Sequence, residues 1–513
     1  MVGGEQAREG DEPQSVGAWC SEAESFREVG RAHGTEEVGE VAGNARRVDG
    51  GTGCGQEEVR SAAHDRTQGR QAVRALLKRI GERARKEKKE RFTNLLSHIK
   101  APLLKEAYKS LRKEAAAGVD GRTWSDYGEN LEARLLDLQD RIQRGAYRPP
   151  PVRRVHIPKG DGRTRPLGIP AVEDKIVQQA VRMVLEPIYE SDFLGFSYGF
   201  RPGRSQHQAL DALYVALQRK VNWVIDADIR SFFDTIDHGW MERFIEHRIG
   251  DRRLVRLLMK WLRAGVMEDG KLHEVQQGTP QGGCISPLMA NVYLHYVVDV
   301  WARQWRKRQA KGQMYVVRYA DDLVMGFERE QDARAMQAAI AERLAKFGLE
   351  LNAEKTRVIR FGRFAHEHCA KEGRHRPETF DFLGFTHICA KGLDGRFRLI
   401  RRTSRRKRAA KTRALRKELR KRRHDPVPDQ HRWLVSVLRG HANYYGVPGN
   451  SRALKSFRNE LRNEWHRQLQ RRSQRARWSN EKHNRFDQKF PIPALQIAHP
   501  YPPDRFFSRR ARP

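Results

Sequence analysis

The segment MYVVRYADDLVMGF, residues 314–327, limits the fold more than any other feature of this chain. Two runs rich in β-branched and aromatic residues flank a short Ala-Asp-Asp sequence, which predicts two strands joined by a tight turn. Adjacent acids in a turn are common on protein surfaces, because Asp favours turns for local reasons. A surface turn, however, needs neither the Tyr before the acids nor the Leu-Val-Met after them. The pattern therefore predicts a partly buried hairpin with Asp321 and Asp322 at its tip.

A second acidic segment, VIDADIRSFFDTID at residues 224–237, contains another strand that ends in an acid. Asp228 closes this apolar run, and a cap at a strand end is the simplest interpretation of one such Asp. Together with the hairpin acids it offers three carboxylates from two strand ends. This is an oxygen ligand set for two Mg²⁺ ions about 3.5–4 Å apart, the arrangement that serves in-line phosphoryl transfer. Asp226, Asp234 and Asp237 lie nearby and remain open as ligands.

The charge balance predicts a polyanionic partner. The chain has 99 Lys and Arg against 64 Asp and Glu, a formal net charge of +35, and such an excess favours nucleic acid. Five scattered cysteines without a C-x-x-C pair argue against a zinc ribbon and a disulfide scaffold. We expect no signal peptide and no membrane-spanning segment, because no suitable leader and no run of about 18 apolar residues occurs. The expected location is the cytoplasm.

Seven further motifs occur in order around the two acidic segments. They are AGVDG (117–121), IPKGDGRTRPLGIP (157–170), EPIYE (186–190), SYGFRPGRSQH (197–207), QGTPQGGCISPLMANVYL (277–294), GLELNAEKT (348–356) and FDFLGF (380–385). With YADD, they resemble reverse transcriptases, and more narrowly the reverse transcriptase–maturases encoded by bacterial and organellar group II introns. The resemblance implies an α+β fold: a right-hand polymerase with fingers and palm, followed by an α-helical thumb or maturase domain.

The resemblance and the composition together predict four parts. Residues 1–68 lack apolar periodicity and are expected to be a disordered extension. Residues 69–390 are expected to form the fingers and palm, and residues 391–465 the thumb or maturase domain. Residues 466–513 are expected to be a basic tail that binds DNA.

The resemblance also assigns roles to the acids. It implies that Asp228, Asp321 and Asp322 are catalytic and hold two Mg²⁺ ions. Lys355, in NAEKT, is the candidate general acid for the leaving pyrophosphate, a role that needs positioning and a suitable pKa. A solvated lysine at a helix start is the competing interpretation of Lys355.

Residues that bind the incoming dNTP are expected on three segments. Lys159 and Arg165 surround a glycine-containing turn and suit phosphate oxygens, one as a point charge and one as a planar fork. Gln281 is expected at the base or the sugar. Phe233 follows Asp228 at the position where the family places an aromatic ring that excludes a ribose 2′-hydroxyl. A core phenylalanine is the alternative, and it suits Phe232 better.

Two segments are expected to contact nucleic acid. Arg201 and Arg204 lie in the aromatic and arginine-rich motif SYGFRPGRSQH, which suits a template strand. Residues 401–423 form a basic run in which Leu415 and Leu419 make a narrow apolar stripe, so we predict a helix. Its self-repulsion favours an RNA partner. The expected contacts there are Arg405, Arg406, Lys407 and Arg408.

One histidine- and cysteine-containing segment invites a zinc assignment. His366, His368, Cys369 and His375 fit no compact tetrahedral spacing, and we expect an insertion loop. No cysteine follows Cys389, so the expected relatives are intron proteins that lack the zinc-binding endonuclease.

Three functions compete. The favoured one is an RNA-directed DNA polymerase that binds its group II intron RNA, assists splicing as a maturase, and copies the intron into target DNA by target-primed reverse transcription during retrohoming. It would use dNTPs, act at the bacterial nucleoid, and have no membrane partner; a homodimer is left open. The second is a domesticated relative acting in DNA repair or defence. The third is a splicing chaperone that uses the palm only as a scaffold, against which the retained carboxylates argue.

Overall fold

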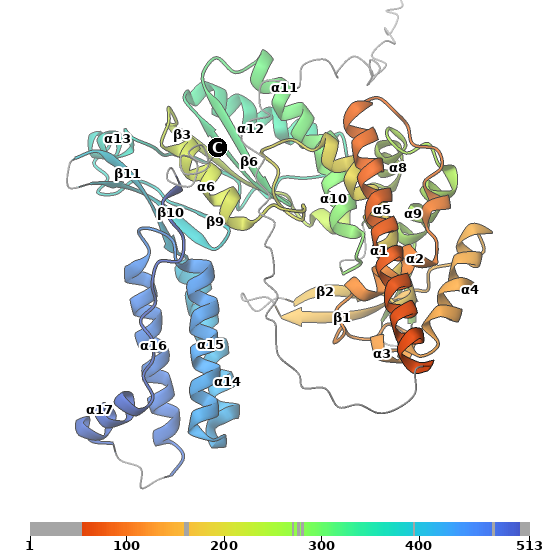
Figure 1. Cartoon of the computed structure of the whole chain (residues 1–513). Coiled ribbons are helices and arrows are strands. Elements are labelled where there is room, and N and C mark those ends of the chain that lie inside the picture. Colours follow the sequence, from red (N-terminus) through yellow and green to blue (C-terminus); the bar gives the residue numbers. More distant parts are fainter. Residues whose placement is uncertain are drawn as a thin grey trace, which may run out of the picture.

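The computed structural model describes most of the chain after residue 53, with short gaps. The described ranges are 54–158, 164–268, 271–273, 278, 282–392, 395–473 and 478–502. These residues form three β-sheets, two of four strands and one of three. Figure 1 shows a helix-rich part with a small sheet, a central sheet backed by helices, and a column of long helices. The expected α+β fold with a helical C-terminal region is confirmed.

The helix-rich part is held together by helices that bury apolar side chains against one another. Its helices are α1 (Cys54–Lys86), η3 (Leu96–His98), α2 (Ala101–Ser110), α3 (Trp124–Gly128), α4 (Leu131–Gln143) and α5 (Val172–Asp192). In α5, Ile176, Ala180, Val184 and Ile188 recur every four residues and are all buried. This spacing places them on one helical face, and α1 and α2 pack against α5.

A small mixed sheet adjoins these helices. Its strands are β1 (Val152–Pro158), β2 (Thr164–Ile169), β4 (Val266–Glu268) and β5 (Lys271–His273), in the order β2-β1-β4-β5. The β1 strand pairs antiparallel with β2 and parallel with β4. The two strands that flank the turn predicted in the IPKGDGRTRP motif therefore pair with each other.

The central sheet contains the predicted acidic hairpin. Its strands are β6 (Met314–Tyr319), β7 (Asp322–Phe327), β3 (Trp223–Asp228) and β8 (Arg357–Arg360). They lie in the order β6-β7-β3-β8, and every neighbouring pair is antiparallel. The strands from residues 314–327 and 224–228, far apart in sequence, are therefore direct neighbours.

Helices cover the central sheet, and the two faces belong to two hydrophobic clusters. Ile225 and Ala227 of β3 join the larger cluster, whereas Val224 joins a smaller one with Val324 and Phe385. This division follows from the alternation of side chains along a strand. The helices of this part are α6 (Gln206–Leu217), α7 (Phe232–Thr235), α8 (His238–Glu246), α9 (Arg252–Leu262), α10 (Ser286–Leu294), η4 (His295–Asp299), α11 (Val300–Arg308) and α12 (Glu330–Ala345).

A three-stranded sheet links the central sheet to the helical column. Its strands are β9 (Phe380–Phe382), β10 (Phe385–Lys391) and β11 (Phe397–Thr403). Before them, the segment expected to be an insertion loop instead contains a short helix, α13 (Ala365–Lys371). Cys369 is buried in it, and His366 Nε2 lies 3.1 Å from the carbonyl oxygen of Cys389. These contacts anchor α13 to the sheet.

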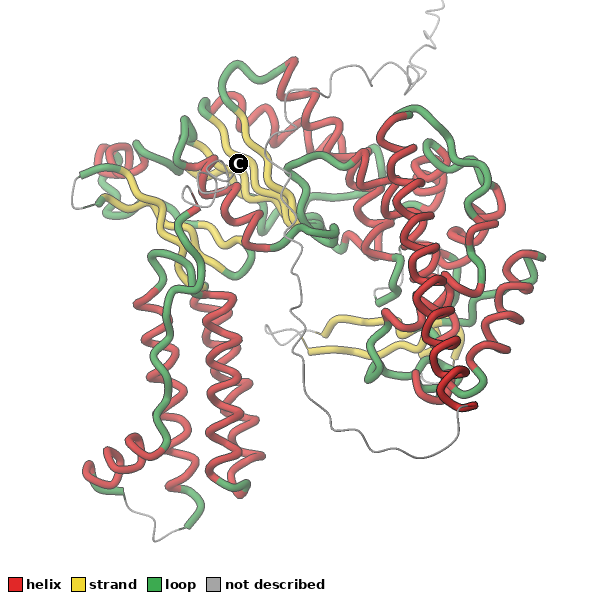
Figure 2. The backbone as a smooth tube through the Cα atoms, in the orientation of Figure 1, coloured by secondary structure: helices red, strands yellow, loops and turns green. Residues whose placement is uncertain are grey.

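The helical column has a core of its own. It contains α14 (Arg405–Lys421), η5 (Arg422–His424), α15 (Val427–Tyr445), α16 (Ser451–Gln470) and α17 (Asn480–Lys489). Leu415 and Leu419, predicted as an apolar stripe, are buried against Leu434, Phe457 and Trp465. Figure 2 shows these helices projecting away from the central sheet, with the chain after α17 running back along them.

The structure moves several expected boundaries. A boundary at residue 465 falls inside α16, because Trp465 and Leu469 are buried in the same core and the helix continues to Gln470. The helical column begins at Arg405 rather than at residue 391, since β10 pairs with β11 as far as Thr403. At the other end, α1 already begins at Cys54, inside the range expected to be disordered.

The C-terminal segment is not a separate unit where it is described. Arg458 on α16 donates to the carbonyl oxygens of Ile492 and Pro493, and the amide of Ala498 donates to Gly446 O at 2.8 Å. Residues 491–499 are thus part of the helical column. None of the helices in the described ranges is both long and apolar enough to cross a bilayer.

Candidate active site

The central sheet brings the predicted acids together. Asp228, the last residue of β3, is the direct cross-strand partner of Asp322, the first residue of β7. Since like charges directly opposite each other destabilise an antiparallel pair, this pairing costs stability. Asp321 is adjacent in the turn between β6 and β7. The three carboxylates proposed from sequence therefore lie at one end of one sheet.

The turn that carries Asp321 has an unusual backbone. Tyr319 and Asp322 pair across β6 and β7, which leaves only Ala320 and Asp321 in the loop. Ala320 has φ = 56°, a left-handed conformation that costs a residue with a Cβ atom roughly 1–2 kcal/mol. The surrounding protein must supply contacts that hold it there.

The carboxylates repel one another. The pKa of Asp322 is raised to about 7, first by the desolvating protein around it and then by the charges of Asp321, Asp228 and Asp226. Asp322 nevertheless keeps exposed surface, so solvent and ligands can reach it. The pKa of Asp226 is raised to about 6, chiefly by desolvation. A cation bound among these groups would relieve the repulsion.

Asn352 and Lys355, in the segment that leads into β8, both contact Asp228. Lys355 Nζ lies 2.8 Å from Asp228 Oδ2, and Asn352 Nδ2 donates to the same oxygen at 3.2 Å. The amide of Asn352 also donates to the carbonyl oxygen of Asp228 at 2.8 Å. Lys355 lies in a turn before β8 and not at a helix start, so the competing interpretation lacks its helix. Asn352 was not predicted, because one Asn in a loop carries no distinct sequence signal.

The donor chemistry fits a hard divalent cation, which prefers carboxylate oxygens. Asp228, Asp321 and Asp322 supply such oxygens, and the charge of Lys355 partly offsets their mutual repulsion at Asp322. In the part of the chain that is described, no three acidic, His or Cys side chains already converge closely enough to enclose a metal. The residues suit the ion, and binding would draw them together.

The other nearby acids differ in their roles. Asp237 caps α8, because its Oδ1 accepts the amide of Trp240 at 2.7 Å. Asp234 is exposed on the short helix α7. Asp226 and Asp228 are two residues apart on β3 and therefore lie on the same face of the sheet. Of these three, Asp226 is the one placed beside the carboxylate site.

The two phenylalanines after β3 have different environments. Phe232 is buried and packs against Tyr293 at 6.4 Å between ring centroids, so its interpretation as a core residue is confirmed. Phe233 is half-buried. Gly278 brings the following loop against this segment: its φ is +85°, and a Cβ there would lie 2.7 Å from the carbonyl oxygen of Phe233.

The expected dNTP contacts are only partly visible. Lys159 and Gln281 lie outside the described residues, and for Arg165 only the backbone, in β2, is described. Gly282, the residue after Gln281 in the sequence, lies so close to β2 that an added Cβ would be 2.5 Å from the carbonyl oxygen of Gly168. The two segments predicted to hold the nucleotide are therefore neighbours.

Arg201 requires a correction. It was expected to contact nucleic acid, but its side chain is only 4% exposed. It forms two hydrogen bonds of 2.9 Å with the carboxylate of Glu190 and donates to the carbonyl oxygens of Leu194 and Ser197. Its charge and its donors are thus used inside the protein. Arg204 is half-buried and lies over the Tyr198 ring at 5.4 Å.

The basic residues of α14 lie on the surface. Arg405, Arg406 and Lys407 are exposed, and Arg408 is 3.4 Å from Glu460. All four occupy the first turn of the helix, which contains no acidic residue. Positive charge at a helix N-terminus is unfavourable, because that end already carries partial positive charge. A polyanion would offset this repulsion.

Comparison with known proteins identifies the family. Residues 157–387, from β1 to β10, match the family described as reverse transcriptase (RNA-dependent DNA polymerase). Over 319 residues the chain is 35% identical to protein YkfC of Escherichia coli. The match covers 55% of this chain and 78% of YkfC. The chain belongs to the reverse transcriptase family.

The names of other relatives of this reverse transcriptase refer to introns. It is 38% identical over 223 residues to the group II intron-encoded protein LtrA of Lactococcus lactis, covering 43% of this chain and 37% of LtrA. It is 29% identical over 129 residues to nuclear intron maturase 3, mitochondrial, of Arabidopsis thaliana, covering 25% and 18%. The resemblance to group II intron reverse transcriptase–maturases is thus confirmed, although the chain spans only about a third of LtrA.

The reverse transcriptase also has buried polar residues that sequence reasoning missed. Arg318, Asp299 and Asn291 are each no more than 1% exposed, and Arg318 donates hydrogen bonds to both of the other two behind the acidic turn. An arginine inside the otherwise apolar strand MYVVRY was the available clue. Its partner, however, lies on a different element and is not marked by any local pattern.

Proposed function

We propose that this reverse transcriptase copies RNA into DNA at the junction of β3 and β7, with Asp228, Asp321 and Asp322 as ligands of two Mg²⁺ ions. The observation that carries the proposal is the direct pairing of Asp228 with Asp322 next to Asp321. The three acids thereby lie at one strand end, where burial and then their mutual repulsion raise the pKa of Asp322. Such an arrangement is costly unless cations bind there.

The residues around the carboxylates have separate tasks. The bound Mg²⁺ ions would supply acidification of the primer 3′-hydroxyl and neutralisation of the pyrophosphate charge. Lys355 carries an ammonium group that contacts Asp228 and is 54% exposed. It would deliver a proton to the leaving pyrophosphate. Phe233 would contact the sugar and favour dNTPs. Lys159, Arg165 and Gln281 would hold the triphosphate and base.

We further propose that the protein binds a group II intron RNA and assists its splicing. The name of LtrA states that a group II intron encodes it, and the name of the plant protein states that it is an intron maturase. In this chain, the exposed Arg405, Arg406 and Lys407 at the start of α14 supply the RNA-binding charge. Splicing itself would be catalysed by the RNA, so the polymerase carboxylates are not needed for it.

The same particle would then insert the intron into DNA. The protein would remain on the excised RNA, bind target DNA through the basic surface of its C-terminal part, and extend the cut DNA strand by target-primed reverse transcription at the nucleoid. The exposed basic residues of α17 would contact the phosphates of the DNA backbone; they are Lys482, Arg485 and Lys489.

The test combines two assays on one variant. Wild type and Asp321→Ala/Asp322→Ala are compared in RNA-templated primer extension with dNTPs and Mg²⁺ and in splicing of the RNA that flanks the gene. The proposal expects loss of extension and retention of splicing in the variant. Extension without any splicing would favour the domesticated polymerase, and splicing without wild-type extension would favour the scaffold.

A further inference from the structure

Arg318 lies on β6, three residues before Asp321, and its side chain is 1% exposed. The other buried residues of this strand, Met314, Val316 and Val317, are apolar. A buried guanidinium group is costly unless its charge and its five N–H donors are all paired. The strand therefore buries a charged guanidinium group, at a cost in stability, immediately behind the proposed catalytic acids.

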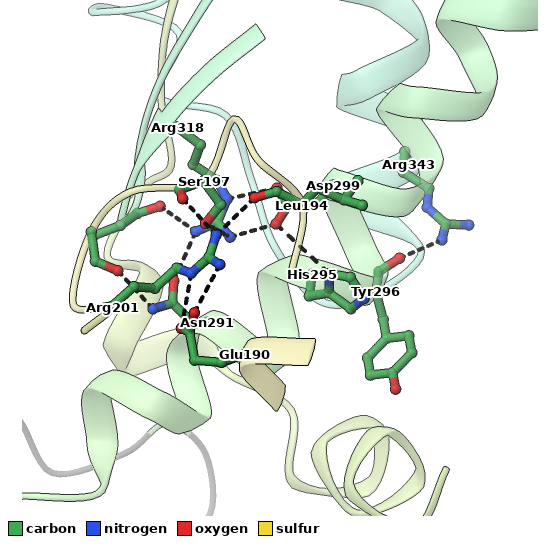
Figure 3. A network of polar contacts seen from close by, with 12 residues as sticks. Glu190, Leu194, Ser197, Arg201, Asn291, His295, Tyr296, Asp299, Arg318 and Arg343 are labelled. Atoms are coloured by element: carbon green, nitrogen blue, oxygen red, sulfur yellow. Dashed lines mark hydrogen bonds and ion pairs between the residues drawn. The ribbon is translucent and has the colours of Figure 1, made fainter. Parts of the chain in front are cut away.

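Every donor of this guanidinium group is used (Figure 3). Nε and Nη2 donate to the two carboxylate oxygens of Asp299, at 2.7 and 2.5 Å. Nη2 also donates to Ser197 Oγ at 2.7 Å. Nη1 donates to Asn291 Oδ1 and to the carbonyl oxygen of Ala320, both at 3.0 Å. Asp299 is fully buried, so water does not replace any of these contacts.

The bond to Ala320 connects this pair to the acidic turn. Ala320 has the left-handed backbone described above, with φ = 56°. Its carbonyl group belongs to the peptide unit that leads into Asp321. By fixing that carbonyl group, Arg318 fixes the orientation of the peptide from which the Asp321 carboxylate projects.

The opposite side of the turn is fixed by the same network. Asn291 donates from Nδ2 to the carbonyl oxygen of Gly199 at 2.8 Å. Gly199 lies so close to the turn that a Cβ on it would be 2.3 Å from the amide nitrogen of Ala320. Backbone hydrogen bonds join Arg318 to Phe196 and Tyr198 along the edge of β6 that faces away from β7. The turn is therefore enclosed between Arg318 and residues 196–199.

The surrounding charges do not compete for this pair. His295 Nδ1 is 4.0 Å from Asp299 Oδ2, but burial lowers the pKa of His295 to about 4 and keeps it neutral near pH 7. The neighbouring Arg201 is satisfied by Glu190. Asp299 is thus committed to Arg318.

We propose that the Arg318–Asp299 pair is a positioning device for the catalytic turn, which holds Ala320 in its left-handed conformation and thereby sets where the Asp321 and Asp322 carboxylates meet Asp228. Neither residue of the pair is assigned contact with substrate. The inference rests on the proposed role of the carboxylates. A buried ion pair is often no more stabilising than apolar residues of similar volume, so stability alone does not explain a donor that is directed at Ala320.

The test uses Arg318→Met, Arg318→Lys and a matched control, Arg248→Met. Arg248 is also 1% exposed and is ion-paired with Asp192 at 2.9 Å, but its other hydrogen bonds go to carbonyl groups near the end of α1, away from the acidic turn. Both methionine variants lose a buried ion pair. Only the Arg318 variants lose the bond to Ala320. Lysine retains the charge but lacks the planar fork that reaches Asp299 and Ala320 together.

Two readouts are measured on each folded variant. The first is hydrogen–deuterium exchange of residues 319–323 without Mg²⁺ or substrate, which reports the turn independently of activity. The second is primer extension, resolved into kcat, KM for dNTP and the Mg²⁺ concentration at half-maximal rate. We expect both Arg318 variants to exchange faster at the turn. We also expect their kcat to fall at least about tenfold, with a several-fold higher Mg²⁺ requirement and a KM within about twofold of wild type.

Arg248→Met should lower the melting temperature while leaving turn exchange and kcat within about twofold of wild type. Unchanged turn exchange and unchanged Mg²⁺ dependence in the Arg318 variants would overturn the inference and leave the pair a purely structural element. Failure of wild type itself to extend a primer would refute the proposed function. The exchange measurement would still decide whether Arg318 holds the turn, and Arg318→Lys serves if the methionine variant does not fold.

Discussion

Lys355 Nζ lies 2.8 Å from Asp228 Oδ2, across 127 residues of sequence. The contact joins the loop before β8 to the end of β3 and puts an ammonium group directly on a carboxylate of the site. It gives Lys355 a place that a solvated surface lysine would not have. It also means that a divalent cation approaching Asp228 meets a competing positive charge, which can swing toward the pyrophosphate because the lysine is half-exposed.

Replacement of Lys355 by Met should lower kcat for primer extension by about 100-fold, the lower range for a lost general acid, with KM for dNTP little changed. Lys355→Arg, which keeps the charge but does not release its proton near neutral pH, should be nearly as slow. Rates measured over pH 6–10 provide the check. An Arg variant with wild-type kcat would show that only charge is needed.

Asp322→Asn should stabilise the metal-free protein more as pH rises. The pKa of Asp322 is about 7 in the folded protein and about 3.9 when unfolded. The folded state therefore binds its proton more tightly, and stability present below pH 4 is lost as pH rises to 7. Melting temperatures of both proteins at pH 5 and pH 8 test this. The gain from Asn should be larger at pH 8, and added Mg²⁺ should reduce it; equal gains at both pH values would contradict the account.

Gly278→Ala should destabilise the loop that packs on Phe233. Both Gly278 and Gly145 have positive φ, +85° and +74°, but an added Cβ meets Phe233 O at 2.7 Å in the first case and nothing within 4 Å in the second. Gly145→Ala is therefore the control for backbone strain alone. We expect a larger fall in melting temperature for Gly278→Ala and weaker discrimination against ribonucleotides. Equal effects of the two substitutions would mean that the close approach is unimportant.

Replacement of Arg405, Arg406 and Lys407 by Gln should weaken intron RNA binding yet raise the melting temperature slightly. Relief of positive charge at a helix N-terminus contributes about 0.3–1 kcal/mol per residue, whereas each lost phosphate contact reduces the salt dependence of binding. The control replaces Arg413, Lys417 and Arg420, exposed residues further along the same helix, and so removes equal charge. Equal loss of RNA affinity in both triple variants would show that only net charge matters.

The sequence predicted the positions of the three carboxylates on their strands well, because the signal is local. Strand, turn and strand follow directly from MYVVRYADDLVMGF, and Asp228 ends its strand as expected. Arg201 was misassigned because an arginine beside aromatic residues looks the same in sequence whether it faces RNA or a buried Glu190. Only the fold decides between the two.

The remaining differences have the same origin. Whether α16 ends near residue 465 or at Gln470 depends on burial of Leu469 in a core built from three helices. The Arg318–Asp299 pair likewise depends on η4 lying behind β6, which no pattern in either segment indicates. Long-range partners, and not local propensity, set these features.

The most direct test of the central claim is single-turnover extension of a DNA primer on an RNA template by Asp228→Asn. Asparagine keeps the shape of the side chain and removes one negative charge from the β3–β7 junction. The account predicts a fall in rate of about 1,000-fold or more, with the Kd for primer–template within about threefold of wild type. Extension near the wild-type rate would contradict the assignment of the active site.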